Sequence, residues 1–487
     1  MHNLLNNLPV GTPVLVGPGI SWDRTALEAH VDRAMQALRG RKNPQAPVAL
    51  LADNTPEWIA IDLATQQLGI ALVPLPAFFT PAQWRHAIEA ADVQAIFCPT
   101  PQAAQALGFT MPVPFDGTLH LYESARAGIS GNLPDIQKIT FTSGTTAQPK
   151  GVCLSARQQW DVAQGLQASL AGLQIRRHLN LLPLAVLLEN IAGVYTALLS
   201  GATNICLPLA ETGLRGASQF DPEICLDAIG RHQAESVILL PQMLQALVTV
   251  SRAHEPRIRS LKFVAVGGGK TPEPLIRAAR EKGFPVYEGY GLSECGSVVS
   301  LNLPGADRPG SCGKPLPNRL VRIATDGEIE VGGAGIAHYL GDAAHDIDWL
   351  ASGDLGHLDA DGFLYIDGRK KNILVSAYGR NISPEWPEAE LLGAGPIAQA
   401  VVFGDARPWL VAAIVPASGE MADAALQAAV DRANARLPDY ARIRRWFRTD
   451  AFSPADATAT ANGRPRRGAI AQRCQQQIAA AYAPQGA

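Results

Sequence analysis

The stretch TFTSGTTAQPKG, residues 140–151, follows a β-rich run and is too polar to lie in a core. A strand ending at Thr140 to Thr142 would deliver a flexible turn whose hydroxyls and backbone N–H groups suit phosphate oxygens, and Lys150 adds a movable positive charge. The stretch lacks the Walker pattern, which needs G-x-x-x-x-G-K-[ST] at the start of a helix. Taken alone, it leaves a phosphate-binding loop and an ordinary surface turn equally open.

Around this loop, strand-like and helix-like runs alternate, which is typical of sheets covered by helices. Residues 25–40 place Leu27, Val31, Ala34, Met35 and Leu38 on one helical face, and Gly40 is expected to end that helix. Short β-rich runs then recur, and most of them are separated by a stretch that can form a helix: 48–53, 95–99, 139–142, 203–208, 236–241 and 263–269. These runs predict an α/β fold.

The pattern of the sequence changes twice toward the C-terminus. Near residue 320 short strands with turns begin, and Asp326-Gly327 and Asp361-Gly362 are hairpin signals. After about residue 371 a smaller unit begins, with a hairpin expected over 398–416 and a helix over 420–437. We therefore predict a domain over residues 1–370 and a second, smaller domain over residues 371–487.

Composition limits the class of protein. Of 487 residues, 47% are apolar and 17% charged, and the net charge of −3 gives no reason to expect a nucleic-acid partner. Seven scattered cysteines without a C-x-x-C pair argue against a disulfide framework or a zinc site and fit a reducing cytoplasm. The first ten residues lack the pattern of a signal peptide, and Pro183, Glu189 and Asn190 interrupt the most apolar stretch (179–201). We read that stretch as a buried strand leading into a helix.

Several further segments share a resemblance with the loop. TSGTTAQPKG resembles the phosphate loop of the adenylate-forming superfamily, which includes acyl-CoA synthetases, firefly-type luciferases and peptide-synthetase adenylation domains. Other matching segments follow in the order of that family: YEGYGLSECG (287–296), ASGDLG (351–356), DGRKKNILVSAYGRNISPEWPE (367–388) and TANGRPRRGAI (460–470). The pattern is most similar to acyl-CoA synthetases.

The resemblance implies a fold and a reaction. The fold would be a large N-terminal domain of helix-covered sheets plus a distorted β-barrel subdomain, with a small mobile α+β C-terminal domain. Such enzymes join a carboxylate to the α-phosphate of ATP, release pyrophosphate and pass the acyl group to a thiol. Catalysis must offset phosphate charge and hold the reactants in line. The implied cofactors are ATP, Mg²⁺ and coenzyme A.

The resemblance also implies roles for single residues. Lys150 would bind the β and γ phosphates together with Thr142, Ser143, Gly144, Thr145 and Thr146. Glu294, in a segment with Gly291 and Ser293, would hold Mg²⁺, a hard cation that prefers oxygen ligands. Tyr290 would stack on adenine, Asp354 would accept hydrogen bonds from the ribose hydroxyls, and Arg369 would contact the ribose or phosphates. Gly267 and Gly268 would let the backbone approach the ligand closely.

Two residues bear on the C-terminal domain. In the family this domain rotates about a residue two after the G-R arginine, here Lys371. Relatives usually carry a catalytic lysine in the last motif, which bridges the substrate carboxylate and the α-phosphate, and here Arg464 stands in its place. No lysine follows Lys371, so no nearby lysine can substitute. Arginine keeps the charge but differs in length and geometry, which leaves adenylation plausible and untested.

The substrate and the acceptor remain open at this stage. Residues 182–202 resemble the matching stretch of long-chain acyl-CoA synthetases, which favours an apolar fatty or aryl acid, and Val186 replaces a usual histidine or aromatic residue. The segment from Arg442 onward contains eight arginines and only two acidic residues. This excess of positive charge could bind phosphates, an acidic carrier protein or, at most peripherally, a membrane, or it could form a merely solvated surface. The leading prediction is a carboxylic acid–CoA ligase. The alternatives are a ligase that loads a carrier protein or another acceptor, and a non-catalytic descendant that binds nucleotide or acyl ligand.

Overall fold

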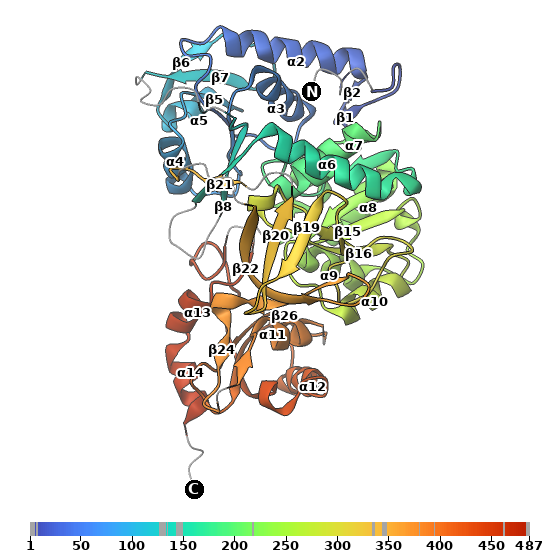
Figure 1. Cartoon of the computed structure of the whole chain (residues 1–487), viewed down its shortest axis with the longest axis vertical. Helices are drawn as coiled ribbons and strands as arrows, with labels where there is room; N and C mark the ends of the chain where they lie inside the picture. The colour runs from blue at the N-terminus through green and yellow to red at the C-terminus, as the bar shows by residue number, and fades with distance from the viewer. Residues whose placement is uncertain are drawn as a thin grey trace.

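The computed structural model describes residues 5, 8–125, 133, 135–142, 150–216, 219–333, 337–342, 348–378, 380–393, 395–460 and 463–483. The chain forms an elongated molecule, with the N-terminal sheets at one end and the C-terminal elements at the other (Figure 1). In the described part of the chain, no helix combines the length and the apolar composition that crossing a membrane requires.

The N-terminal region contains two large sheets. The first has nine strands in the order β18-β17-β16-β15-β14-β10-β11-β1-β2, and its central strands are parallel. Its strands are β1 (Leu15–Gly17), β2 (Ile20–Trp22), β10 (Arg177–Leu179), β11 (Thr203–Ile205), β14 (Ser236–Leu239), β15 (Phe263–Val266), β16 (Val286–Tyr290), β17 (Ser300–Leu301) and β18 (Lys314–Pro315). A separate two-stranded sheet pairs β12 (Leu214–Arg215) with β13 (Gln219–Phe220).

The second sheet has eight strands in the order β21-β9-β8-β4-β3-β5-β7-β6. Its strands are β3 (Val48–Leu50), β4 (Leu72–Pro74), β5 (Ala95–Cys98), β6 (Phe109–Val113), β7 (His120–Ser124), β8 (Lys138–Thr142), β9 (Lys150–Leu154) and β21 (His338–Tyr339). The parallel strands β5, β3, β4 and β8 lie side by side. β9 pairs antiparallel with β8, so the stretch that opened the sequence analysis connects two neighbouring strands.

Helices cover both sheets, as the alternating pattern predicts. They are α2 (Arg24–Arg39), α3 (Pro56–Leu68), α4 (Pro81–Ala90), α5 (Pro101–Ala106), α6 (Ala156–Leu170), α7 (Thr196–Leu199), α8 (Pro222–His232), α9 (Pro241–Val250) and α10 (Glu273–Glu281). One core cluster joins residues of α2, α3 and α6 to residues of both sheets. Separate clusters lie on the outer faces, with α8 to α10 on the first sheet and α4 on the second.

The amphipathic helix predicted over 25–40 is confirmed in detail. α2 buries the five apolar residues named from the sequence, and Gly40 is its C-cap. Asp23 begins the helix because its carboxylate accepts a hydrogen bond of 2.9 Å from the backbone N–H of Ala26. The β-rich runs named from the sequence are also confirmed as β3, β5, β8, β11, β14 and β15.

The unit predicted as a barrel subdomain is built on a four-stranded antiparallel sheet in the order β19-β20-β22-β23. The strands are β19 (Arg319–Ile323), β20 (Glu328–Gly333), β22 (Trp349–Leu358) and β23 (Leu364–Arg369). Both hairpin signals are confirmed, because Gly327 and Gly362 adopt positive φ angles of 85° and 82° in the turns that join these strands.

The C-terminal region has its own apolar core around a three-stranded sheet, β26-β27-β28. Its elements are β24 (Leu374–Val375), β25 (Asn381–Ile382), α11 (Glu385–Leu392), β26 (Ile397–Phe403), β27 (Leu410–Pro416), α12 (Asp423–Asn434), β28 (Ile443–Arg448), α13 (Arg467–Arg473) and α14 (Gln475–Tyr482). The predicted hairpin and helix are β26–β27 and α12. Three of the C-terminal arginines form ion pairs inside this region, Arg448 with Asp423, Arg467 with Glu388 and Arg473 with Asp456.

Candidate active site

Most of the described predicted site residues line a single cavity of about 2770 Å³. The carboxyl ends of β8, β15 and β16 point to it, and ligands of open α/β sheets usually bind at such ends. β8 leads to the predicted phosphate loop, β15 to Gly267 and Gly268, and β16 to the segment from Tyr290 to Glu294. The cavity is larger than the roughly 300–1,000 Å³ typical of a single small-molecule site. It therefore has room for more than one substrate.

Asp354 is the centre of a buried polar cluster. The hydroxyl of Tyr290 donates a 2.7 Å hydrogen bond to Oδ2 of Asp354, and Nε of Arg369 lies 2.7 Å from Oδ1. The last pair follows from strand register, since Asp354 on β22 lies opposite Arg369 on β23. Burial raises the pKa of Asp354, whereas Arg369 and the Tyr290 hydroxyl act to lower it. Each carboxylate oxygen keeps a lone pair, so Asp354 can still accept hydrogen bonds from a ligand.

Glu294 and Lys150 are linked through Tyr339, which sequence reasoning missed. Glu294 lies in the short 3₁₀ helix η5 (Ser293–Cys295), and its Oε1 accepts a 2.6 Å hydrogen bond from the Tyr339 hydroxyl. The ammonium of Lys150 lies 5.2 Å from the centroid of the Tyr339 ring, a distance suited to a cation–π contact. Burial and the Glu294 carboxylate raise the pKa of Tyr339, so this hydroxyl is a hydrogen-bond donor at neutral pH.

Two predicted glycines occupy positions that favour glycine, one because of close approach and the other because of its backbone angle. An ideal Cβ at Gly291 would lie 1.5 Å from the carbonyl oxygen of Ser297, so no side chain fits there. Gly268 has a φ of +79°, which favours glycine, and a Cβ there would meet Leu240 at 2.9 Å. The Gly268 carbonyl also accepts a 2.9 Å hydrogen bond from Nε of Arg464. The last motif therefore reaches the turn after β15, although 196 residues separate the two positions.

The remaining predicted site residues divide into two groups. Gly267 and Ser293 line the cavity, and so does Lys371, which lies in the 3₁₀ helix η6 (Lys370–Asn372). Ser143, Gly144, Thr145 and Thr146 lie outside the described residues, and Thr142 is described only as the last backbone position of β8. The structure thus brings together the predicted residues from six sequence segments and gives no placement for residues 143–146 of the predicted phosphate loop.

A π-helix forms another wall of the cavity. Residues Leu188–Tyr195 form this helix, called η2, and α7 continues it. Leu188, Ala192 and Gly193 line the cavity. The helix predicted in the stretch 179–201 is present, but the strand β10 ends at Leu179, the first residue of that stretch, and the π geometry was not predicted. π-Helical turns occur frequently at functional sites.

The π-helix also carries a buried carboxylate, Glu189, whose partners are all from the chain. His178 Nε2 lies 2.9 Å from Glu189 Oε1, while the side-chain amide of Asn180 and the backbone N–H of Leu182 donate to the same carboxylate at 3.0 and 2.9 Å. Val186, noted as a departure from relatives, lines the cavity just before this helix. This part of the cavity thus combines apolar walls with a buried His178–Glu189 pair whose polar atoms bond within the chain.

The fold and the site define an enzyme class that the comparisons also find. The model of the AMP-binding enzyme family matches residues 5–338, and that of the AMP-binding enzyme C-terminal domain matches residues 371–486. The first match covers more than half of the chain. The chain therefore belongs to the AMP-binding enzymes, the adenylate-forming superfamily.

Among similar proteins, a 2-succinylbenzoate–CoA ligase of Bacillus velezensis is 33% identical over 57% of this chain and 57% of its own length. That of Bacillus pumilus is 29% identical over 73% of this chain and 74% of its own length. An indoleacetate–CoA ligase of Aromatoleum aromaticum is 29% identical over 77% of this chain and 79% of its length. The chain thus spans just over half of the first of these relatives and about three quarters of the others.

Solved structures show the same fold. The anthranilate CoA ligase AuaEII in complex with anthranoyl-AMP superimposes with a TM-score of 0.82 at 19% identity, over 98% of this chain and 97% of that one. The o-succinylbenzoate CoA synthetase MenE of Bacillus subtilis, bound to its acyl-adenylate, gives a TM-score of 0.77 at 23% identity, over 96% and 97%. The predicted α/β class with a large N-terminal and a small C-terminal part is confirmed.

Proposed function

We propose that this protein is an AMP-forming ligase that activates an aryl carboxylic acid as its acyl-adenylate, with release of pyrophosphate, and then transfers the acyl group to the thiol of coenzyme A. One observation carries the proposal: Asp354, Glu294, Lys150 and Arg464 converge on one cavity from separate sequence segments. This set offers an acceptor for ribose, a ligand for a hard cation and two cations for phosphate and carboxylate oxygens.

The aryl class is favoured over a fatty acid by the relatives, which are named as ligases of 2-succinylbenzoate and indoleacetate. The apolar wall of the π-helix fits a ring, and the Glu189 carboxylate is already satisfied by the chain, so it leaves no free charge for a substrate amine. The fatty-acid part of the sequence prediction gains no support from the relatives.

The donor set fits Mg²⁺ when ATP is present. Among the described residues there is no group of three or more His, Cys, Asp or Glu side chains that could hold a metal ion. Mg²⁺ is commonly held by one or two carboxylates together with substrate phosphates, so the single carboxylate of Glu294 is sufficient. The bound ion would neutralise phosphate charge. The Tyr339 hydroxyl orients Glu294 through its 2.6 Å hydrogen bond and leaves Oε2 for the ion.

Arg464 and Lys371 have proposed roles in the two half-reactions. Arg464 would bring its guanidinium to the substrate carboxylate and the α-phosphate, the task of the lysine in relatives. Lys371 would be the hinge between a domain of residues 1–370 and one of residues 371–487, so that the second domain can turn and open a path for the thiol. The hydrogen bond from Arg464 to Gly268 would hold the domain in its adenylating position and break on rotation.

Acid-dependent exchange of labelled pyrophosphate into ATP tests the first step. A panel of benzoate, anthranilate, indoleacetate, 2-succinylbenzoate and decanoate should give exchange with at least one aryl acid, and Glu294→Gln should abolish it. Thioester formation is then compared with coenzyme A and with a phosphopantetheinylated carrier protein. If only the carrier protein is loaded, the acceptor is the carrier protein and not coenzyme A. ATP binding without exchange for any acid would support a non-catalytic descendant instead.

A further inference from the structure

An ion pair that the proposed reaction does not use lies in the core of the N-terminal region. The side chains of Lys138 and Asp62 are 0% and 1% exposed, and Lys138 Nζ lies 2.9 Å from Oδ1 of Asp62. Burial lowers the pKa of Lys138, and the Asp62 charge opposes that shift. Desolvation of two charges costs several kcal/mol per ion, so such a pair is weak evidence for added stability. Its role has to be sought in the elements that it joins.

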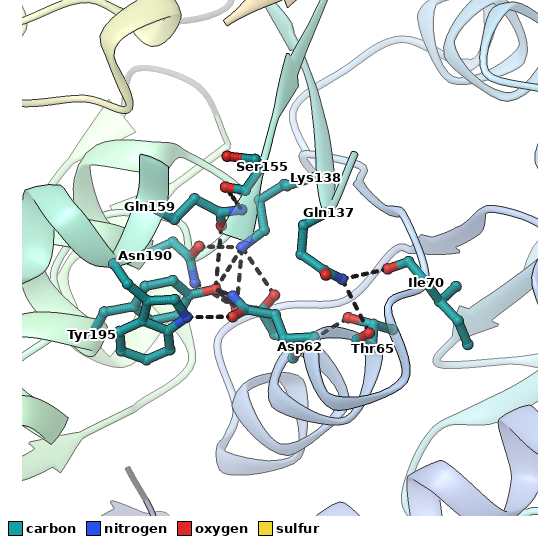
Figure 2. Close-up of polar contacts among 11 residues, drawn as sticks. Asp62, Thr65, Ile70, Gln137, Lys138, Ser155, Gln159, Asn190 and Tyr195 are labelled. Carbon is teal, nitrogen blue, oxygen red and sulfur yellow. Dashed lines mark hydrogen bonds and ion pairs between the residues drawn. The ribbon is translucent and has the colours of Figure 1, made fainter. Parts of the chain in front are cut away.

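The pair joins three elements (Figure 2). Asp62 belongs to α3, Lys138 begins β8, and Asn190 and Tyr195 lie on the π-helix η2. Lys138 Nζ donates to the Tyr195 hydroxyl at 2.9 Å and to Oδ1 of Asn190. Asp62 Oδ2 accepts from the Tyr195 hydroxyl at 2.7 Å and from the Asn190 amide at 2.9 Å. The ammonium is thus a direct polar link between β8 and η2.

Each end of this link leads to a part of the active site. β8 runs from Lys138 to Thr142, immediately before the phosphate loop, which is about 13 Å at the usual rise of a strand. On the other side, Leu188, Ala192 and Gly193 of the same π-helix line the cavity. A shift of η2 caused by an acid in the cavity would therefore move the anchor of the phosphate strand.

We propose that Lys138 is a positioning residue that couples the phosphate end of the active site to its acyl end, by holding β8 and the π-helix in one register through Asp62, Asn190 and Tyr195. The inference rests on the proposed function, because it assumes that nucleotide binds after β8 and acid beside η2. Binding of either substrate then orders the site of the other. If the Lys138–Asp62 pair had a solely structural role, its removal would lower the stability of the protein but would not change how the acyl end of the active site responds to nucleotide at the phosphate end.

Gln137 provides a matched control for a solely structural role. It lies next to Lys138 and is buried, and its amide donates to the carbonyl oxygens of Thr65 and Ile70 at 3.0 and 2.7 Å. These bonds tie the residue before β8 to α3 and its following turn, and none of the bonds drawn from the Gln137 side chain goes to η2 (Figure 2). Gln137→Leu therefore removes buried hydrogen bonds next to the same strand but leaves the proposed link in place.

Two double variants cut the link from opposite sides. Asp62→Asn/Lys138→Met removes both charges and the ammonium, while an asparagine at position 62 can still bond Asn190 and Tyr195. Asn190→Leu/Tyr195→Phe removes the partners on the π-helix and keeps the ion pair, so one variant remains informative if the other fails to fold. Amide hydrogen exchange of residues 188–195 is measured with and without the non-cleavable nucleotide α,β-methylene-ATP plus Mg²⁺.

The nucleotide should slow exchange in the π-helix by about fivefold in the wild type and in Gln137→Leu, the lower end of typical site–site coupling. In both double variants this effect should be lost, although the nucleotide still protects the residues flanking the phosphate loop. An effect of unchanged size in a folded double variant, or none in a wild-type enzyme that binds the nucleotide, would overturn the inference. A wild type that does not bind the nucleotide would instead contradict the proposed function, and this inference with it.

Discussion

Arg464 donates hydrogen bonds from Nε and a terminal nitrogen to the carbonyl oxygen of Gly268, so the C-terminal region contacts the turn after β15 through a forked cation. A lysine at this position would offer a single ammonium rather than a planar fork. The replacement of the usual lysine is thus accompanied by a contact that suits arginine.

Replacement of Arg464 should separate the two half-reactions. Arg464→Ala should slow pyrophosphate exchange by about 10²–10³-fold, the usual cost of losing one group that stabilises transition-state charge. Arg464→Lys should keep exchange near the wild-type rate because the positive charge remains. Thioester formation from synthetic benzoyl-AMP and coenzyme A should be unchanged in both variants. An equal loss in both half-reactions would mean that Arg464 supports the fold rather than adenylation.

Asp354→Asn should weaken ATP binding. The change removes the charge that pairs with Arg369 and leaves an amide in place of one acceptor oxygen. Hydrogen bonds to charged groups contribute about 1.5–3 kcal/mol, so we expect the KM for ATP to rise by about 10- to 100-fold.

Tyr290→Phe is the matched control for this prediction. It removes only the 2.7 Å hydrogen bond to Asp354 and keeps the aromatic ring and the carboxylate charge. The KM for ATP should rise less than in Asp354→Asn. If Asp354→Asn lowers kcat and leaves the KM for ATP unchanged, the carboxylate does not bind the nucleotide.

The pattern of the sequence was sufficient to predict the strands β3, β5, β8, β11, β14 and β15 and the helix α2, whereas the residues that line the cavity were named from the resemblance to the adenylate-forming superfamily. The sequence did not reveal the role of Tyr339, because its hydrogen bond to Glu294 depends on the pairing of β21 with β9. It also could not predict the π-helix, since an i to i+5 pattern is stabilised by tertiary packing and has no simple apolar period.

The buried ion pair left a signal in the sequence that the reading did not use. Asp62 interrupts the apolar helix PEWIAIDLATQQL, and Lys138 begins the β-rich run KITFT. Charged residues inside such runs are almost never fully buried unless they are paired. The pairing itself spans 76 residues of sequence and required the fold.

Glu288 should make the stability of the protein depend on pH. It is buried beside the cavity, accepts a 2.9 Å hydrogen bond from the backbone N–H of Thr271, and burial raises its pKa to about 7. Between the ordinary pKa of 4.5 and 7, the unfolded state releases this proton while the folded state retains it. Stability therefore falls over that interval and levels off above it.

Glu288→Gln cannot ionise and should remove this dependence. At pH 5 the variant and the wild type should unfold at similar urea concentrations, whereas at pH 8 the variant should be more stable, by up to about 3 kcal/mol. The exposed Glu420→Gln controls for the loss of one charge and should show no such pH-dependent gain. A constant difference between Glu288→Gln and the wild type from pH 5 to 8 would contradict the shifted pKa.

Gly193 should be coupled energetically to Glu189. A Cβ at position 193 would lie 2.4 Å from Oε1 of Glu189 and 2.6 Å from Nε2 of His178, the two atoms that hydrogen-bond at 2.9 Å. Gly193→Ala therefore has to displace this pair, and overpacking of this kind costs about 1–3 kcal/mol of unfolding free energy. The neighbouring Ala192→Gly, also on the cavity wall, loses helix propensity without touching the pair.

A double-mutant cycle tests this coupling. A Glu189→Ala background removes the nearer of the two obstructing atoms and frees the His178 ring from its bond to Glu189, so that the ring can turn away. Gly193→Ala should then cost less than half of its value in the wild type, and the interaction energy should exceed about 0.5 kcal/mol. Urea unfolding of the four proteins gives this energy directly. Additive costs would show that the π-helix accommodates a methyl group at position 193 by moving away from His178, and that the polar pair does not fix the shape of the acyl end.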